Sequence, residues 1–348
     1  MKVAVDAQLA IGTATGIGEY VNGLILALQA EGVDVIPLSA PKLDPWRFDR
    51  RVYWDQVLLP QRARACGADL LHCASGTIPL TATMPLVATV HDVAWLRVQA
   101  HARPYARYYF GRLATDRYRH VDAIVVDSAF SSRELLELVS GLRPERVRVV
   151  YPGVADDFCA LERRGGDGST ILVVGTVERR KNLELIVRAM PFLEQARLVS
   201  VGPFTAYRDE CIAIARELGV EKRIEFRGYV ERAELLELYA TCAVVAMPSQ
   251  YEGFGYGLAQ ALCAGVPCVA SDRSSLPEIA LDSAPVLSID HLAPWVEALA
   301  AGLLGEADIR AHAVRSAAIE RFTWKRSVRA TIEAYEFALA TNAQRRST

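Results

Sequence analysis

The sequence predicts an α/β fold with two domains, each built around a mostly parallel sheet. Short apolar runs that suit strands alternate with helical patterns along the chain, and this alternation is typical of parallel sheets. The 348 residues are enough for two domains of ordinary size. A polar, glycine-rich stretch at residues 162–169 interrupts the rhythm, which then starts again. We therefore expect one domain over residues 1–160 and a second over residues 161–324.

The composition is that of a globular protein. Hydrophobic residues make up 51% of the chain, and the formal net charge of −2 gives no electrostatic reason to bind nucleic acid. No apolar run approaches the ~18 residues that span a bilayer. The start of the chain, Met1–Asp6, has a strand pattern with an acid in it, unlike a signal peptide. The cysteines include no C-x-x-C pair, so we expect reduced thiols in a cytoplasmic protein.

The first half opens with a strand at residues 3–5, which ends at Asp6, followed by a loop and a helical pattern over residues 19–28. The glycines of the loop, Gly12, Gly16 and Gly18, do not fit the G-x-G-x-x-G spacing of dinucleotide-binding proteins. This mismatch disfavours a nicotinamide-dependent dehydrogenase.

Two histidines lie at the ends of predicted strands. The strand at residues 68–73 contains His72 near its end, and the strand at residues 86–90 is followed by His91 and Asp92. Ligands of open parallel sheets bind at the carboxyl ends of the strands. The alternative for each is a hydrogen-bonded structural histidine. After the strand at residues 122–126, Ser131 and Glu134 have the spacing of a capping box at a helix start.

The segment Arg97–His120 is strongly basic and aromatic. It contains six arginines and one acid, with tyrosines and a phenylalanine between them. A basic helix with aromatic residues suits an anionic membrane surface. Two other interpretations stay open: a solvated helix face, and a phosphate-binding wall for an anionic acceptor. Nucleic acid is disfavoured, because no nucleic-acid-binding motif accompanies the segment.

The second half begins a new series of strands, at residues 171–174, 197–201, 223–226, 243–247 and 267–270. The loop after the first strand contains Gly175 and the run Arg180-Lys181-Asn182. Two adjacent cations after a strand, with an asparagine at the start of the next helix, suit a diphosphate. The alternative is a solvated run of surface charge.

A glycine-rich turn follows the strand at residues 243–247 and leads into a helix that is closed by Gly265 and Pro267. It runs Ser249-Gln-Tyr-Glu-Gly-Phe-Gly-Tyr-Gly and carries Glu252. Backbone N–H groups at the start of such a helix are unpaired and can hold a phosphate. The turn alone is equally compatible with an ordinary strand–turn–helix connection.

Glu252 and Gln260, eight residues apart, resemble the Glu-x7-Glu signature of the retaining glycosyltransferases of family 4, which have the GT-B fold. Further motifs of that family follow in its order: Gly16-Ile-Gly18, Thr89-Val-His-Asp92, Arg180-Lys-Asn182 and Phe322-Thr-Trp324. The resemblance covers nearly the whole chain. It implies two Rossmann-like domains whose sheets face each other across a cleft, and a last helix, residues 325–348, that crosses back to the N-terminal domain.

The resemblance also implies roles for residues at matching positions. Glu252 would face the donor sugar, His91 would lie near its 6-hydroxyl, and Arg180 with Lys181 would neutralise the diphosphate. Asp92 and His72 would lie on the acceptor side. The remaining donor-binding residues would be Gly16, Gly18, Gly175, Asn182, Tyr229, Val230, Gly253, Phe254, Gly255, Tyr256, Gly257, Leu258 and Gln260.

Two features bear on the mechanism. The chain has no D-x-D motif and hence no evident carboxylate pair for Mg²⁺, so we expect no metal cofactor. Gln260 replaces the second glutamate of the signature. Its amide oxygen can accept one ribose hydroxyl but cannot take two as a carboxylate does, which costs ~1–3 kcal/mol of donor affinity. We expect weaker nucleotide binding rather than an inactive protein.

The function that the resemblance implies is metal-independent transfer of a hexose with retention of configuration. We expect mannose to move from GDP-mannose to a glycan or a polyprenyl-diphosphate-linked acceptor in cell-surface polysaccharide synthesis, at the inner face of the cytoplasmic membrane. A UDP-hexose donor is the first alternative. A sugar-nucleotide epimerase of the same fold and a non-catalytic sugar-nucleotide-binding subunit are the others.

Overall fold

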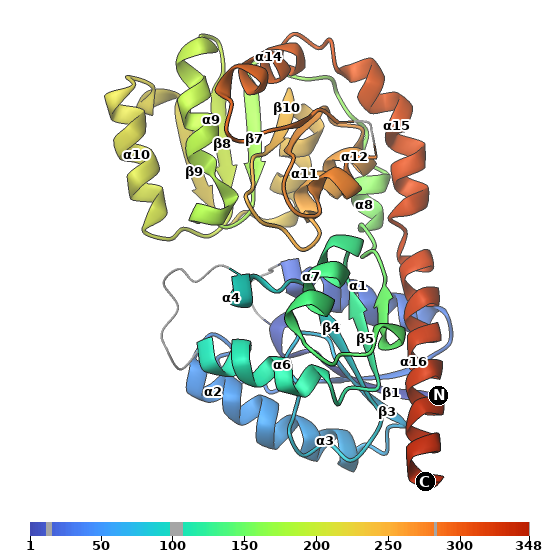
Figure 1. Cartoon of the computed structure of the whole chain (residues 1–348). Coiled ribbons are helices and arrows are strands. Elements are labelled where there is room, and N and C mark those ends of the chain that lie inside the picture. Colours follow the sequence, from blue (N-terminus) through green and yellow to red (C-terminus); the bar gives the residue numbers. More distant parts are fainter. Residues whose placement is uncertain (12–15, 98–106, 282–283, 348) are drawn as a thin grey trace. The chain divides into compact units, whose positions relative to one another are not determined.

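The chain folds as two α/β units, each with its own parallel sheet of six strands (Figure 1). The structure is a computed structural model that describes residues 1–11, 16–97, 107–281 and 284–347. Unit 1 comprises Met1–Gly153 together with Thr323–Thr348, and unit 2 comprises Val154–Phe322. The predicted α/β fold with a parallel sheet in each half is confirmed. Within the described ranges, no helix is both long and apolar enough to cross a membrane.

The sheet of unit 1 has the strand order β2-β1-β3-β4-β5-β6. Its central strands are buried on both faces, which explains their nearly continuous runs of valine, isoleucine and leucine. The strand order reverses between β1 and β3, and ligands of such sheets bind at this reversal. The strands are β1 (Lys2–Asp6), β2 (Asp34–Leu38), β3 (Leu70–Cys73), β4 (Leu86–Val90), β5 (Ala123–Val126) and β6 (Val147–Val149).

Helices and short turns connect these strands. They are α1 (Gly16–Ala30), α2 (Phe48–Tyr53), the π-helical η2 (Trp54–Leu58), α3 (Leu59–Ala65), α4 (Ala94–Arg97), the π-helical η3 (Arg107–Arg112), α6 (Leu113–Tyr118) and α7 (Ala129–Leu138). The final helix of the chain, α16 (Trp324–Ser347), also belongs to unit 1.

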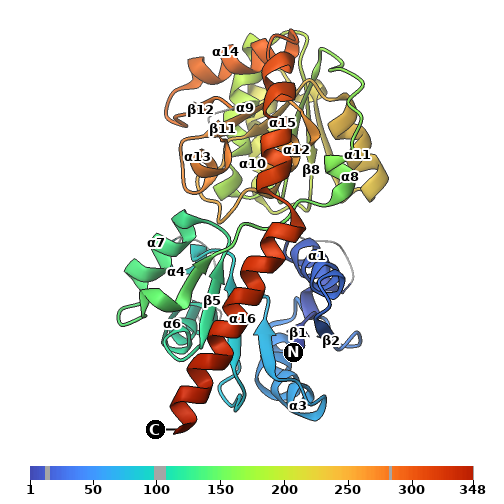
Figure 2. The same ribbon diagram turned by 90° about the vertical axis from the view of Figure 1, so that its right-hand side faces the viewer.

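Figure 2 shows α16 running across the sheet of unit 1 beside α1, and it packs on β4, β5 and α1. Trp324 is the first residue of the helix, and its indole ring packs closely against two glycines. A Cβ atom at Gly23 would lie 2.1 Å from the ring, and one at Gly153 would lie 2.4 Å from it. Further along, the completely buried Tyr335 bonds to His72 of β3. These contacts make the C-terminal helix part of the core of unit 1.

The sheet of unit 2 has the order β12-β11-β10-β7-β8-β9. The chain starts in the middle at β7, runs to the edge at β9 and returns to β10, so the order reverses between β7 and β10. The strands are β7 (Thr170–Val174), β8 (Arg197–Val201), β9 (Ile224–Gly228), β10 (Val244–Met247), β11 (Cys268–Ser271) and β12 (Val286–Leu287).

Two groups of helices cover this sheet. One group encloses the main core of the unit and comprises α9 (Leu183–Ala189), α10 (Tyr207–Glu217) and α14 (Leu292–Leu303). The other packs around α12 (Tyr256–Ala264) and comprises α8 (Asp156–Cys159), α11 (Arg232–Thr241), α13 (Leu276–Ile279) and α15 (Asp308–Arg321).

The structure corrects two details of the sequence interpretation. The polar stretch at residues 162–169, where the domain boundary was expected, lies inside unit 2. Within it, Arg163 donates to the Cys242 carbonyl at 2.9 Å and pairs with Asp308 at 3.0 Å. The units instead divide between Gly153 and Val154. The cap of α7 is Ser128, which accepts from the backbone N–H of the next serine of the motif, Ser131, at 3.0 Å.

Candidate active site

The reversal of strand order in unit 2 brings together the two loops predicted to bind phosphate and sugar. After β7 the chain passes Gly175 and a 3-10 turn, η5 (Arg179–Lys181), before α9. After β10 it passes Ser249 and Glu252 before α12. Because β7 and β10 are parallel neighbours, both loops leave the same edge of the sheet. The Gln250 N–H donates to the Arg180 carbonyl at 2.7 Å and joins the loops directly.

Glu252 is held by two cations and a hydroxyl. Lys181 Nζ donates to its Oε1 at 2.5 Å, and Arg180 Nη1 donates to its Oε2 at 3.3 Å. Ser249 Oγ donates to Oε1 at 2.7 Å. The glutamate is only 5% exposed, and a carboxylate buried to this degree requires such partners. The sequence-predicted catalytic residues of the second half therefore lie in one cluster.

The charges of this cluster fix the protonation of Glu252. Burial acts to raise the pKa of Glu252, but the Lys181 and Arg180 cations outweigh it and hold the pKa below its ordinary value. The carboxylate is therefore an anion at neutral pH. Arg180 Nε also pairs with Glu178 at 2.8 Å. An incoming diphosphate would compete with two protein carboxylates for these cations.

Residues with positive φ allow the strand ends beside the cluster to pack closely together. Gly202, at the end of β8, has φ 139°, and a Cβ atom there would lie 2.2 Å from the Gly175 carbonyl oxygen. A Cβ atom on Gly175 would meet Lys181 Cε at 3.4 Å, so the lysine lies over the end of β7. Asn182 has φ 53° and sits at the N-cap of α9, but its side chain makes no capping bond, contrary to expectation.

The glycine-rich turn is packed into unit 2. Phe254 is 4% exposed, and its ring contacts Phe322 edge-on at 5.6 Å between centroids. Gly255 caps α12 with φ 95°, and a Cβ atom there would lie 2.6 Å from Leu276 Cδ2. Among the other predicted donor-binding residues here, Gly253, Gly257 and Leu258 are buried and Tyr256 is half-buried. The side chains of Phe254 and Leu258 are thus core residues, and Ser275 Oγ donates to the Phe254 carbonyl at 3.0 Å.

Gln260 lies inside α12 and is 3% exposed. Its Oε1 accepts a hydrogen bond from the Tyr239 hydroxyl at 3.2 Å, and the same hydroxyl lies 3.3 Å from the Gly257 carbonyl oxygen. An amide oxygen has two lone pairs. Tyr239 uses one of them, so the amide oxygen expected to hold the ribose is already engaged within the protein.

Aromatic side chains lie at the far ends of β8 and β9. Tyr229 is 44% exposed, and Val230 is half-buried. Phe204, in the loop after β8, is 40% exposed, and its ring packs edge-on against Phe226. The Arg208 guanidinium lies 4.8 Å from the Phe204 ring centroid. Exposed aromatic surface of this kind can support a planar base, and the sequence analysis did not identify Phe204.

In unit 1, His91 follows β4, and both nitrogens of its ring are hydrogen-bonded. Nδ1 lies 2.7 Å from Asp127 Oδ2, and Nε2 lies 3.0 Å from the Ala74 carbonyl oxygen. Because a carbonyl can only accept, Nε2 carries a hydrogen. Burial acts to lower the pKa of His91, but the Asp127 carboxylate outweighs it and raises the pKa. The Asp127 carboxylate thus favours the protonated form of the ring, which packs edge-to-face against Tyr20.

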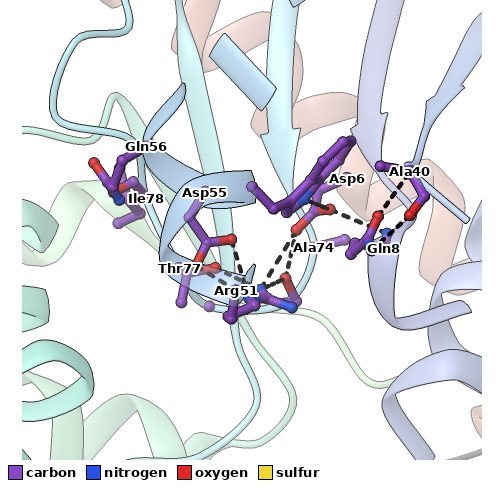
Figure 3. A network of polar contacts seen from close by, with 12 residues as sticks. Asp6, Gln8, Ala40, Arg51, Asp55, Gln56, Ala74, Thr77 and Ile78 are labelled. Carbon is purple, nitrogen blue, oxygen red and sulfur yellow. Dashed lines mark hydrogen bonds and ion pairs between the residues drawn. The ribbon is translucent and has the colours of Figure 1, made fainter. Parts of the chain in front are cut away.

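A buried polar network at the ends of β1 and β3 holds the loop whose Ala74 carbonyl bonds to His91 (Figure 3). Asp6 Oδ2 accepts from Ser75 Oγ at 2.5 Å. Arg51 Nη2 donates to the hydroxyls of Ser75 and Thr77, each at 2.5 Å. Since Ser75 directly follows Ala74, this network sets the position of the carbonyl that bonds to the histidine.

Asp55 lies on the other side of Arg51, 3.0 Å from its Nε atom, and is completely buried. It also accepts a hydrogen bond from the Tyr109 hydroxyl at 3.1 Å. Burial raises the pKa of Asp55 to about 6, although Arg51 opposes the shift. The network therefore contains a carboxyl group that titrates near neutral pH.

The structure favours the structural interpretation of His72. The side chain is completely buried, with Nδ1 2.7 Å from the Tyr335 hydroxyl and Nε2 2.8 Å from Thr89 Oγ1. Burial lowers the pKa of His72 to about 3, so the ring is neutral. Asp92, the other residue expected on the acceptor side, is half-buried and accepts from the Ala94 N–H at 3.0 Å.

Several described side chains of the basic, aromatic segment are engaged in contacts within unit 1. Arg117 is 6% exposed and donates to the Ile78 carbonyl at 2.8 Å, and the Tyr118 hydroxyl donates to the Gly76 carbonyl at 3.1 Å. Arg97 pairs with Glu134 at 2.7 Å. Residues 98–106 of this segment lie outside the described residues, as do residues 12–15 ahead of the predicted Gly16 and Gly18, which begin α1.

Sequence reasoning missed several residues that position the site. Ser274 accepts from the Glu252 N–H at 2.9 Å, and Ser275 donates to the Glu252 carbonyl at 3.0 Å. Asp127 was not singled out either. The signals available in the sequence were Asp127-Ser128 directly after an apolar strand and the serine pair after β11, since residues at strand ends meet at one edge of a parallel sheet.

Comparison with known families accounts for most of the chain. Residues 14–158 match the family model described as Glycosyltransferase Family 4, and residues 162–303 match the one described as Glycosyl transferases group 1. A D-inositol 3-phosphate glycosyltransferase of Acidothermus cellulolyticus is 30% identical, over 89% of this chain and 78% of the relative. One of the same description from Xylanimonas cellulosilytica is 32% identical, over 72% of this chain and 66% of the relative.

Solved structures of glycosyltransferases share the fold over nearly the full length. The sucrose-phosphate synthase of Thermosynechococcus elongatus superposes with a TM-score of 0.78 at 20% identity, covering 98% of this chain and 99% of the other. Anabaena HepE in complex with UDP-glucose gives a TM-score of 0.73 at 18% identity, covering 97% and 99%. The two Rossmann-like units therefore have the GT-B architecture.

Proposed function

The chain belongs to glycosyltransferase family 4, and from that premise we propose that it transfers a hexose from a nucleoside diphosphate sugar to an acceptor with retention of configuration. The observation that carries the proposal is the cluster of Glu252, Lys181 and Arg180 at the reversal of strand order in unit 2. Such a cluster combines an anion for a sugar that gains positive charge with two cations for a leaving diphosphate.

In the proposed mechanism the donor diphosphate takes Lys181 and Arg180 from the carboxylates that hold them in the free protein. As the anomeric carbon loses the diphosphate, these cations neutralise the charge on the departing oxygen. Glu252, released from its ion pairs but still bonded to Ser249, stabilises the developing positive charge on the sugar. We propose that the cations make a divalent metal unnecessary, so that transfer should persist in a chelator.

His91 contributes a fixed positive charge in this proposal, not a general base. Nε2 donates to the Ala74 carbonyl and Nδ1 lies against Asp127, so the protonated ring has no lone pair with which to accept a proton. A cation held in this way would stabilise a hydroxyl or phosphate oxygen placed against the exposed edge of the ring.

The donor that we propose first is GDP-mannose, the sugar nucleotide that the family motifs suggest. A UDP-hexose is the second candidate, and the observation that favours it is the similarity to Anabaena HepE, which was solved with UDP-glucose. The acceptor is a glycan or polyprenyl-diphosphate-linked saccharide, with a phosphorylated cyclitol as the second candidate because of the D-inositol 3-phosphate glycosyltransferases.

A membrane-bound acceptor would require a surface for it on unit 1. Exposed apolar side chains are available there at Trp46 (64%), Tyr53 (47%), Leu80 (63%) and Tyr108 (57%), and aromatic residues suit the membrane interface. We therefore propose membrane contact through these four residues. Co-sedimentation with vesicles of anionic phospholipid should fall for Trp46→Ser and stay unchanged for Arg216→Ser, an exposed residue of unit 2.

The deciding experiment combines donor binding with transfer. GDP or UDP should raise the melting temperature of the protein, and the matching sugar nucleotide should be consumed. Glu252→Gln should retain nucleotide binding but lose transfer, because the cations for the diphosphate remain. Lys181→Met should lose affinity for the diphosphate. Accumulation of an epimerised sugar nucleotide would replace the proposal with an epimerase, and nucleotide binding without turnover would replace it with a binding subunit.

A further inference from the structure

Two cysteines that are distant in the sequence lie side by side in unit 2. Cys159 is the last residue of α8 and is half-buried, and Cys263 is completely buried in α12. The helices that carry them, α8 and α12, pack against each other. Arg315 of α15 holds both segments, with Nε donating to the Cys263 carbonyl at 3.0 Å and Nη2 to the Cys159 carbonyl at 2.8 Å.

The pair is chemically asymmetric. A hydrogen bond with Cys263, supported by Arg315, lowers the pKa of Cys159 below the ordinary value for a thiol, although burial opposes it. The same bond and burial raise the pKa of Cys263. Thiolates rather than thiols react with oxidants, so Cys159 is the nucleophile of the pair and Cys263 is its resolving partner.

No other thiol of the chain has this combination in the structure as described. Burial raises the pKa of Cys242 and Cys268 to about 12 and that of Cys211 to about 11. Cys73 is completely buried. Cys66 is half-buried, and its thiol donates to the Ala63 carbonyl at 3.2 Å. It therefore serves as the matched control.

We propose that Cys159 and Cys263 form a reversible redox site that reacts with a two-electron oxidant such as hydrogen peroxide and closes as a disulfide. The Cys159 thiolate attacks one peroxide oxygen, which gives a sulfenic acid and releases hydroxide. The Cys263 thiol then attacks the sulfenic sulfur, the S–S bond forms, and water leaves with the thiol proton. Overall, two thiols and one peroxide give one disulfide and two water molecules, and a dithiol reverses the reaction.

The disulfide would act on the donor site through α12. A disulfide holds its sulfurs about 2.05 Å apart, closer than two hydrogen-bonded thiols lie, so oxidation draws the end of α12 toward α8. The start of the same helix follows the turn that carries Glu252, and Gln260 lies one turn before Cys263. Oxidation should therefore raise the KM for the donor several-fold, and reduction should restore it.

The first test is chemical and does not rest on the proposed function. The full-length protein is treated with hydrogen peroxide, blocked with an alkylating agent and mapped by mass spectrometry. We expect a peptide linked through Cys159 and Cys263 that dithiothreitol cleaves, in the wild type and in Cys66→Ser alike. Cys263→Ser should instead accumulate a sulfenic acid at Cys159, trapped by dimedone. Absence of the linked peptide, or oxidation of Cys66 in preference to Cys159, would overturn the proposal.

The second test rests on the proposed function, because it measures the donor KM before and after oxidation. Cys159→Ser preserves a hydrogen-bond acceptor for Cys263 and should fold normally, but its KM should not respond to peroxide. A linked peptide without any change in the donor KM would contradict the proposed coupling through α12. An enzyme without measurable transfer would leave the chemical test valid and contradict only the proposed function.

Discussion

At the residue scale, the pairing of His91 with Asp127 makes a prediction about pH. The carboxylate lies 2.7 Å from the ring and keeps its pKa raised. Asp127→Asn retains a hydrogen-bond acceptor but removes the charge, so the pKa of His91 should fall. Since the cation is lost as pH rises through that pKa, the alkaline limb of the kcat/KM profile should move to lower pH.

The charges around the ring define the control for this measurement. The carboxylate of Asp92 also acts on His91, and the neutral His72 and the Tyr20 hydroxyl lie in the adjoining core. Asp116→Asn, at an exposed site paired with Arg119, should leave the profile unchanged. A profile of Asp127→Asn that is merely lower, with the same limbs, would mean that Asp127 only supports the fold.

Gln260 gives the second prediction at this scale. In Gln260→Glu one carboxylate oxygen can accept from Tyr239 while the other accepts a ribose hydroxyl, so donor affinity should rise. A charge-assisted bond adds ~1.5 kcal/mol, equivalent to about tenfold in Kd. Calorimetric titration with the preferred nucleotide measures it. Gln250→Glu, the same change at an exposed position in the preceding loop, is the control, and an unchanged Kd for Gln260→Glu would mean that the ribose is held elsewhere.

Asp55 predicts a pH dependence of stability. Its pKa is raised to about 6 in the folded protein from its ordinary value of 3.8, so the folded state binds the proton more tightly than the unfolded state. The contribution of this group to the free energy of unfolding is therefore greatest at low pH and decreases as pH rises through about 4 to 6. The free energy of unfolding of the wild type minus that of Asp55→Asn, measured with urea, should be smaller at pH 6.5 than at pH 4.5. The same difference at both pH values would contradict the prediction.

Part of the site could be predicted from local motifs. The other partnerships could not, because they join residues that are far apart in the sequence. Glu252, Arg180 and Lys181 belong to recognisable motifs, and the structure joins them. The partnership of His91 with Asp127 spans 36 residues, and no local spacing rule relates two strand ends before the sheet order is known. His72 shows the converse. Its position at a strand end suggested a ligand role, but its Nδ1 atom is hydrogen-bonded to the hydroxyl of Tyr335, far along the chain.

At the scale of elements, the seating of α16 on α1 can be tested at Gly23. A glycine-to-alanine change within a helix normally stabilises it by ~1 kcal/mol. Here the added Cβ would lie 2.1 Å from the Trp324 ring, and overpacking of this kind costs ~1–3 kcal/mol. Because Gly153 also lies against this ring, where a Cβ atom would be 2.4 Å from it, the indole is confined by a second close contact, and the clash should prevail.

Thermal unfolding measures this effect, and the neighbouring residue provides the control. Gly23→Ala should lower the midpoint, whereas Asn22→Ala, on the exposed side of α1, should leave it unchanged or raise it. A raised midpoint for Gly23→Ala would show that Trp324 does not sit in this groove.

The strands and helices were more predictable from the sequence than the contacts that their side chains make. Alternating apolar runs sufficed for the strands, because central strands of parallel sheets are covered on both faces. The segment Arg97–His120 looked like a surface helix, because a sequence shows which side chains are charged but not which groups they bond to. In the structure Arg117 turns inward to a backbone carbonyl at 2.8 Å. The capping residue of α7 was misassigned for a related reason, since Glu134 is engaged by Arg97.

At the scale of the whole molecule, the division into units predicts the effect of removing the last helix. The apolar residues of α16 that are buried in unit 1 are Val328, Ala334, Tyr335 and Ala338. A chain ending at Phe322 should therefore lose amide protection throughout β3, β4 and β5, while β7, β8 and β10 of unit 2 keep theirs. Hydrogen exchange followed by mass spectrometry distinguishes the two sheets, and full protection of β4 in the truncated chain would contradict the assignment.

The discontinuity of unit 1 also has a consequence for synthesis on the ribosome. Residues 1–153 emerge first but lack the helix that covers β4 and β5, whereas unit 2 is contiguous and has its whole sequence once Phe322 has emerged. Domains generally fold as units during translation, so the middle of this chain should reach its native state before the beginning does. Until α16 has emerged, the sheet of unit 1 has an apolar face uncovered, and during that interval a chaperone could bind there.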